Sequence, residues 1–167
     1  MSTEEFIIIV YLIIEEIYPT IVSEPLRKRG FPPALTDIEI ITMQIVGECL
    51  KMDTDKSIWM FFKNNYLSWF PHLGSYPNFC KHCANLWQVH QKITAQLTAH
   101  YGQDHIHFID GFPIPVCRYS RAKRHKNFKE HAGFSYCAAQ QEKYYGFKGH
   151  LVINLEGMIT GYTFAPA

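Results

Sequence analysis

One carboxylate, Asp110, stands in the stretch HFIDGFPIP (residues 107–115), after an apolar run and before a glycine and two prolines. Glycine and proline interrupt strands, so this pattern predicts that Asp110 lies at the C-terminal end of a strand. A carboxylate in that position projects from the edge of a sheet, where a ligand can reach it. The structural alternative is an ordinary turn-forming aspartate before glycine.

A lysine and a histidine form the second candidate group. In the stretch YYGFKGHLVI (residues 144–153), the alternation of a strand places Lys148 and His150 on one face. We expect Asp110, this Lys148/His150 face and the basic segment described next to converge on one phosphate backbone.

Basic residues are concentrated in the second half of the chain. Residues 118–150 contain eight lysines and arginines and two glutamates, whereas residues 1–60 contain ten acids and five bases. Such segregation indicates a polyanionic partner. The first part of this region, residues 118–129, is the basic segment, and we expect it to leave the sheet at the same end as Asp110. Its candidate contacts with this partner are Arg118, Arg121, Lys123, Arg124, Lys126 and Lys129. A solvated loop is the alternative.

The stretch CKHC (residues 80–83) has the spacing of half a zinc site. A structural zinc site needs four ligands, and the rest of the chain has no matching pair. Cys83 also falls on the apolar stripe of an expected helix, where a free cysteine is an ordinary core residue. We therefore expect no zinc. An odd number of cysteines, five, without a secretory leader indicates a reducing, cytoplasmic environment.

Apolar residues at helical spacing and capping boxes predict four helices over residues 3–18, 36–51, 55–66 and 78–101. The first is apolar nearly all round, so neighbours should cover it on several sides. Its nine-residue apolar run, residues 6–14, is too short to span a membrane, which needs about 20 residues. If the polyanionic partner is a nucleic acid, Arg27, Lys28, Arg29 and the helix after Thr36 are the candidates for sequence recognition. A simple packing domain is the alternative for this region.

After Gly102 the pattern becomes extended. Strands are predicted over residues 106–116, 144–153 and 158–164, and the last two form an antiparallel hairpin around Asn154-Leu155-Glu156-Gly157. The prediction is an α+β chain, with a helical N-terminal domain over residues 1–103 and a β-containing domain over residues 104–167.

Two long stretches carry a family resemblance. IDGFPIPVCRYSRAKR (residues 109–124), followed by YYGFKGHLVINLEGMITGYTFAPA (residues 144–167), closely resembles the start of the catalytic domain of bacterial insertion-sequence transposases of the DDE class. RGFPPALTDIEIITMQIVGECL (residues 29–50) and WFPHLGSYPNFCKHCANLW (residues 69–87) are similar to the helical N-terminal region of these proteins. The resemblance implies that residues 104–167 hold the first three strands of a truncated, RNase H-like mixed sheet. It also implies a nucleoid-associated cytoplasmic protein whose partner is DNA at transposon ends.

The resemblance implies DNA strand cleavage and transfer with Mg²⁺ or Mn²⁺ held by three acids, of which Asp110 matches the first. The second aspartate and the glutamate are expected beyond Ala167. We expect Glu142 at the same end of the sheet as Asp110 but in an unpatterned segment, and Glu156 at the opposite end, so that neither replaces them.

The resemblance therefore predicts a chain that is catalytically silent alone. Residues 104–167 should be unstable without a complementing C-terminal portion or full-length transposase, because one edge of the first strand and the sheet faces are left open. The alternative function is that of a non-enzymatic DNA-binding fragment that inhibits transposition.

Overall fold

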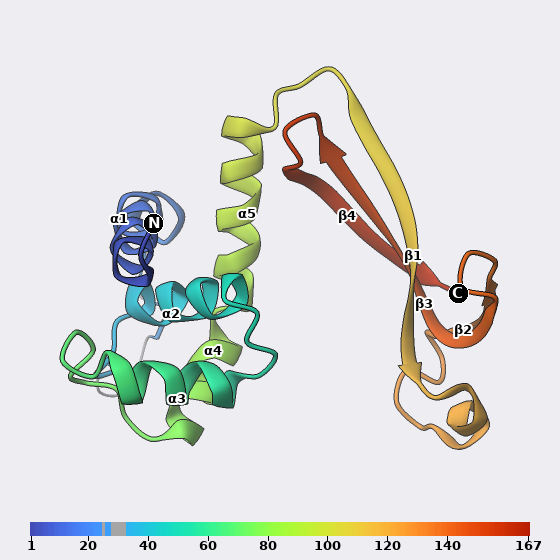
Figure 1. The fold of residues 1–167 in the computed structure, drawn as a ribbon, viewed down its shortest axis with the longest axis horizontal. Coiled ribbons are helices and arrows are strands. Elements are labelled where there is room, and N and C mark those ends of the chain that lie inside the picture. Colours follow the sequence, from blue (N-terminus) through green and yellow to red (C-terminus); the bar gives the residue numbers. More distant parts are fainter. Residues whose placement is uncertain (25, 28–32) are drawn as a thin grey trace. The chain divides into compact units, whose positions relative to one another are not determined.

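The computed structural model describes residues 1–24, 26–27 and 33–167. The chain divides into two compact units, Met1–Gln96 and Leu97–Ala167 (Figure 1). The first is helical and the second is built on a β-sheet, which confirms the α+β class. Lys28 and Arg29, two of the candidates for sequence recognition, lie outside the described residues.

The described residues form five α-helices: α1 (Thr3–Ile21), α2 (Asp37–Cys49), α3 (Asp55–Asn65), α4 (Tyr76–Asn85) and α5 (Trp87–Tyr101). Capping boxes at Ser2, Thr36 and Thr54 begin the first three, and each cap side chain accepts a backbone N–H three residues on. The boxes at Ser2 and Thr36 were predicted. Such caps are local in sequence, which is why the pattern reveals them.

The predicted helix over residues 78–101 is in fact two helices. The break falls at Leu86, which is fully buried and whose backbone N–H bonds to the carbonyl of Cys83, three residues back. A bond of this kind tightens the last turn of α4. The segment contains neither glycine nor proline, so no helix-breaking residue marks the break in the sequence, and it coincides with the full burial of Leu86 in the core.

Helix α1 continues through Pro19 and ends at Ile21, three residues beyond its predicted end. It buries Ile7, Val10 and Ile14, and it packs on α2. The prediction that α1 is covered on several sides is wrong for the helical unit, because the opposite face is exposed at Ile8, Ile9, Leu12 and Ile13. No described helix has the length and hydropathy that a membrane crossing needs.

The core of the helical unit lies between α2 and α3. Ile40, Ile41, Met43 and Val46 of α2 are fully buried, as is Phe62 of α3. A ring-edge contact with Phe70, at 5.1 Å between centroids, extends this core beyond the end of α3.

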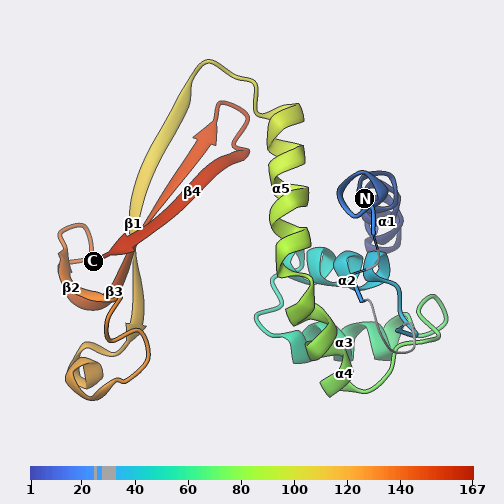
Figure 2. The ribbon, with the colours of Figure 1, turned by 180° about the vertical axis from the view of Figure 1, so that it is seen from behind.

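The second unit contains β1 (His107–Cys117), β2 (Gly133–Cys137), β3 (Glu142–Asn154) and β4 (Ile159–Pro166) (Figure 2). The long strand β3 has β1 on one side, while β2 and β4 pair with successive parts of its other side. The predicted hairpin of β3 and β4 is confirmed. The described sheet has four strands rather than three, and every pairing among them is antiparallel. β2 was missed because its five residues lie within a polar, basic region.

Gly146 marks the tightest backbone approach between β1 and β3. A Cβ at this position would lie 2.0 Å from the carbonyl oxygen of Ile114 and 2.9 Å from the backbone nitrogen of Val116. The ladder has a bulge at the same level, between Pro115 and Cys117. Only glycine therefore allows β1 to pass this close to β3.

Candidate functional site

Asp110 lies inside β1, not at its end. It is the fourth of eleven residues and pairs with Leu151 of β3, so the predicted position at the C-terminal end of the strand is wrong. The strand continues because β1 is an edge strand. Pro113 and Pro115 are two residues apart, so the backbone positions that lack an N–H group lie on the same side of β1. This side faces away from β3, where an edge strand tolerates proline.

The Asp110 side chain is exposed, and one of its oxygens is used locally. Its Oδ1 accepts the backbone N–H of Gly111 at 2.8 Å. On an edge strand alternate N–H groups point outward, and this carboxylate covers one of them. The second oxygen accepts no hydrogen bond from the described residues, which leaves it available to a ligand.

Lys148 and His150 occupy the opposite face of the sheet from Asp110. Residues paired directly across two strands share a face, and these two pair with Pro113 and Gly111, whereas Asp110 pairs with Leu151. A Cβ added to Gly111 would lie 3.2 Å from Lys148 Cε and 3.5 Å from His150 Nδ1, which confirms the side on which they lie. The expected convergence of Asp110 with this pair on one phosphate is therefore wrong.

The basic segment, Glu142 and Glu156 each lie at the other end of the sheet, relative to Asp110, from the end that was predicted. The basic segment begins after Cys117, seven residues beyond Asp110, or about 23 Å along the strand. Glu142 pairs with Cys137 at that far end. The turn that contains Glu156 follows Asn154, which pairs with His107, only three residues from Asp110. These errors share one cause: Asp110 was expected at the end of its strand, but the strand continues for seven residues beyond it, through Pro113 and Pro115.

The basic segment is a folded platform. Residues Tyr119–Arg124 form a short 3₁₀ helix, η1, anchored by the buried side chain of Ala122. The ring of Tyr119 packs edge-on against Phe134 of β2, and Phe134 packs against the buried Tyr145 of β3 at 4.7 Å. These contacts hold the arginines and lysines of the segment against the sheet.

All six candidate DNA contacts of the basic segment are exposed. Arg121 and Arg124 line one cavity of 440 Å³ together with Ser120 and His125. The only ion pair within 4 Å in the described part of the chain lies elsewhere, between His82 and Asp37. The basic segment therefore presents cations that no described carboxylate neutralises.

A complete metal centre is not assembled by the described residues. No group of three or more histidine, cysteine, aspartate or glutamate side chains among them could hold a metal ion. Apart from its direct partner Leu151, the neighbours of Asp110 on its own face are aromatic: Phe108, Phe112, Tyr162 and Phe164, between 39% and 59% exposed. A divalent metal site needs several oxygen ligands, so this donor set does not fit one by itself.

A buried polar chain in the helical unit was missed. His82 of α4 bonds through Nε2 to Oδ1 of Asp37, at the start of α2, and the Tyr18 hydroxyl donates to Oδ2 at 2.7 Å. Burial by itself would raise the pKa of Asp37, but the hydrogen bonds from His82 and Tyr18 and the charges of His82 and Arg27 hold it below its ordinary value. Burial and the bond to Asp37 raise the pKa of Tyr18. One signal was readable in the sequence, because Asn78, Lys81, His82 and Asn85 form an i, i+3, i+4, i+7 polar stripe.

The two cysteines of the CKHC stretch lie on α4, where Cys80 is half-buried and Cys83 is buried. Cys83 is buried in the core, where burial and, to a lesser extent, the charge of Asp55 raise the pKa of its thiol to about 12. A thiol held in its protonated form is a poor metal ligand and a poor nucleophile. Cys83 therefore acts in this unit as an apolar core side chain.

The comparisons with known proteins concern the sheet unit. Residues 101–167 match the family described as Transposase DDE domain. No curated protein and no solved structure matches the chain. The matched segment contains Asp110, the whole basic segment and the four strands that position them. Residues 101–167, less than half of the chain, are therefore similar to the DDE domain of transposases, which supports a DDE-class transposase.

Proposed function

We propose that this chain acts in DNA transposition, binds DNA through the basic segment and contributes Asp110 as one metal ligand for DNA strand cleavage and transfer. The observation that carries the proposal is the transposase DDE match over the segment that holds both Asp110 and the exposed cations. The DNA partner would be the ends of a bacterial insertion sequence, and the protein would work in the cytoplasm, at the nucleoid.

The separation of Asp110 from the basic segment suits one DNA strand. Phosphates follow one another every 3.4 Å along a strand, so about 23 Å corresponds to roughly seven nucleotides. Contacts of Arg121 and Arg124 with phosphates would fix the register of the DNA without reading its bases. Lys148 and His150 would make a separate backbone contact, because they lie on the other face of the sheet.

Cleavage needs more carboxylates than Asp110. Mg²⁺ or Mn²⁺ would bind with Asp110 as one ligand, and the remaining acids would come from a complementing C-terminal portion or from a full-length transposase. Glu142 cannot replace them, since it pairs with Cys137 at the far end of β3. The polypeptide of residues 1–167 is therefore expected to bind DNA without cutting it.

The same observation favours a second candidate function. A chain that binds transposon ends with a single acid in place would compete with the complete enzyme and inhibit transposition. This candidate differs from the first in one respect, namely that no partner ever completes the metal site.

Removal of three cations from η1 is expected to weaken DNA binding. The triple variant Arg121→Ala, Lys123→Ala and Arg124→Ala should flatten the slope of log affinity against log salt by about 2.7, since each lost phosphate contact removes about 0.9. Fluorescence anisotropy with duplex DNA between 50 and 200 mM salt, roughly the range over which such binding changes most, measures this slope. Lys51→Ala, Lys56→Ala and Lys92→Ala, three exposed cations of the helical unit, form the matched control. An equal slope for both triple variants would rule out the basic segment as the DNA contact.

DNA nicking distinguishes the two candidate functions. The chain is incubated with supercoiled DNA and Mn²⁺, alone and with full-length transposase, and compared with Asp110→Asn. No nicking by the chain alone, but Asp110-dependent nicking in the mixture, is the expected result for the first candidate. Reduced nicking by the mixture, whether or not Asp110 is present, is the result expected of an inhibitor.

A further inference from the structure

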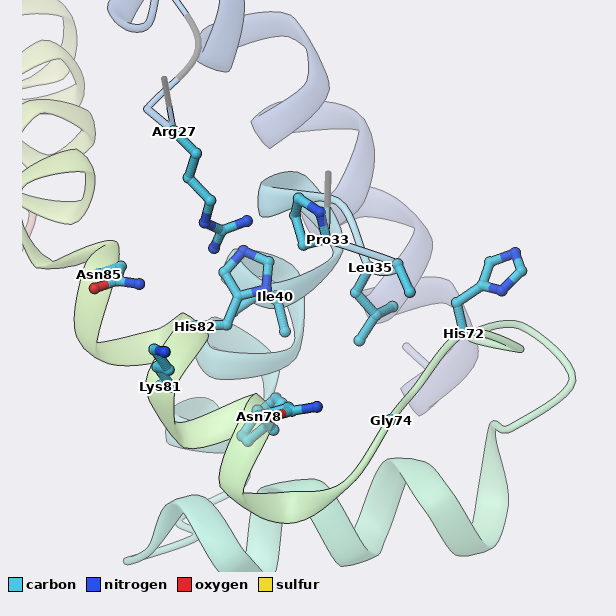
Figure 3. A pocket seen from close by; sticks show the side chains of 12 residues that line it. Arg27, Pro33, Leu35, Ile40, His72, Gly74, Asn78, Lys81, His82 and Asn85 are labelled. Carbon is cyan, nitrogen blue, oxygen red and sulfur yellow. The ribbon is translucent and has the colours of Figure 1, made fainter. Parts of the chain in front are cut away.

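A pocket of 360 Å³ opens in the helical unit beside α4, close to the start of α2 (Figure 3). Asn78, Lys81, His82 and Asn85 of α4 line one wall, and Arg27 lines another. Figure 3 shows the Arg27 guanidinium next to the His82 ring, with Lys81 and Asn85 on the same helix as His82. No aspartate or glutamate is among the described residues that line this pocket.

The two cations of the pocket have no carboxylate partner. Neither Arg27 nor Lys81 lies within 4 Å of a carboxylate in the described ranges, where His82–Asp37 is the only ion pair. Residues 25 and 28–32 contain no acid at all, so they cannot supply one. Two positive charges therefore line a space in which no described carboxylate pairs with them directly, although the charge of Arg27 also acts on Asp37 outside the pocket.

The carboxylate of Asp37, which bonds to the pocket residue His82, already has two hydrogen-bond partners. Asp37 does not line the pocket, and its two oxygens bond to His82 Nε2 and to the Tyr18 hydroxyl. The same bonds hold His82, which is only 7% exposed, in a fixed position between α2 and α4. Nδ1 of His82 makes no hydrogen bond within the described residues. The Asp37–His82 and Asp37–Tyr18 hydrogen bonds therefore shape the pocket without a ligand. They do not involve the N–H groups of Arg27 and Lys81.

We propose that this pocket binds a phosphate group. Arginine presents a planar fork of N–H donors that matches phosphate oxygens, lysine adds a point charge, and the Asn78 and Asn85 side chains add amide donors. A volume of 360 Å³ lies within the range of small-ligand pockets, about 300–1,000 Å³, so a group larger than one phosphate also fits.

The phosphate can belong to DNA or to a free phosphorylated compound. If it belongs to DNA, the pocket is a second DNA contact, and the inference then rests on the proposed function. If it belongs to a free compound, the inference stands without the proposed function. Binding of inorganic phosphate tests the pocket in both cases, and binding of duplex DNA separates them.

The test is a titration of the full chain with inorganic phosphate, followed by the backbone amide NMR signals of α4. Saturable shifts at residues 78–85 are expected. Lys81→Met should raise the Kd for phosphate about tenfold or more, because a hydrogen bond to a charged group is lost, and Arg27→Met should act in the same direction. Lys92→Met, an exposed lysine of α5 outside the pocket, is the matched control and should leave this Kd within a factor of about two.

Each result has a defined meaning. A Kd for phosphate that is equal in wild type, Lys81→Met and Arg27→Met overturns the proposal, and so does the absence of saturable shifts in α4. If Lys81→Met weakens phosphate and DNA binding together, the pocket holds a DNA phosphate. If it weakens phosphate binding alone, the ligand is a free phosphorylated compound. Failure of the wild type to bind DNA would overturn the proposed function and leave the phosphate result standing.

Discussion

Gly146→Ala is expected to destabilise the sheet unit by about 3 kcal/mol, the upper end of what overpacking costs in a well-packed interior. The new methyl group would stand 2.0 Å from the Ile114 carbonyl oxygen and 2.9 Å from the Val116 nitrogen. Both atoms belong to the backbone of β1, so no side-chain rotation relieves the overlap. β1 must move away from β3, and the hydrogen bonds beyond the bulge at Pro115 are lost.

Gly161→Ala is the matched control in the same sheet. The nearest atoms to its new methyl group would be those of the Val152 side chain at 3.8 Å, an ordinary contact. The substitution should leave stability unchanged or raise it by up to about 1 kcal/mol, because alanine restricts the unfolded chain. Amide hydrogen exchange of β3 measures both effects. Equal exchange protection in the two variants would contradict the close approach of β1 and β3.

Asp37→Ala is expected to destabilise the helical unit by about 3 kcal/mol. The substitution leaves His82 and the Tyr18 hydroxyl without their shared acceptor in a largely buried site, and removal of one partner from a buried pair typically costs 3–5 kcal/mol. Asp53→Ala is the control, because Asp53 is exposed and makes no side-chain hydrogen bond within the described residues. All three tryptophans, Trp59, Trp69 and Trp87, lie in the helical unit, so urea unfolding followed by tryptophan fluorescence reports on this unit alone.

The effect of Asp37 should disappear in acid. Its pKa in the folded protein is lowered. Burial, the largest single influence, raises this pKa, but the hydrogen bonds from His82 and Tyr18 and the charges of His82 and Arg27 together lower it by more. Its contribution to stability is therefore fully present above the unfolded pKa, about 3.9, and is lost as the pH falls through the lower folded pKa. The difference in unfolding free energy between wild type and Asp37→Asn should narrow below about pH 4. A difference of the same size at pH 3 and pH 7 would show that the Asp37 charge contributes nothing.

Local patterns allowed most elements to be predicted. The capping boxes at Ser2 and Thr36 and the hairpin around residues 154–157 each involve residues only a few positions apart. Their hydrogen bonds form within one turn or one hairpin, so the types of the residues concerned are enough to predict them. The same holds for the charge of the basic segment, which is a property of composition.

The position of Asp110 could not be predicted in the same way. Glycine and proline after an aspartate normally indicate the end of a strand, but an edge strand accommodates proline wherever the missing N–H faces away from its neighbour. Whether a strand lies at an edge depends on the order β1-β3-β2, a property of the whole sheet. The register then determined that Lys148 and His150 share a face with Gly111 and not with Asp110.

The sequence by itself therefore determined the α+β class, the starts of the first two helices, the β3–β4 hairpin and the basic character of the segment after β1. Only the tertiary structure decided which side chains meet. Asp37 and His82 are 45 residues apart and come together only because α2 packs against α4. The Arg27–Lys81 pocket has the same origin, since it depends on packing between residues that are distant in the sequence.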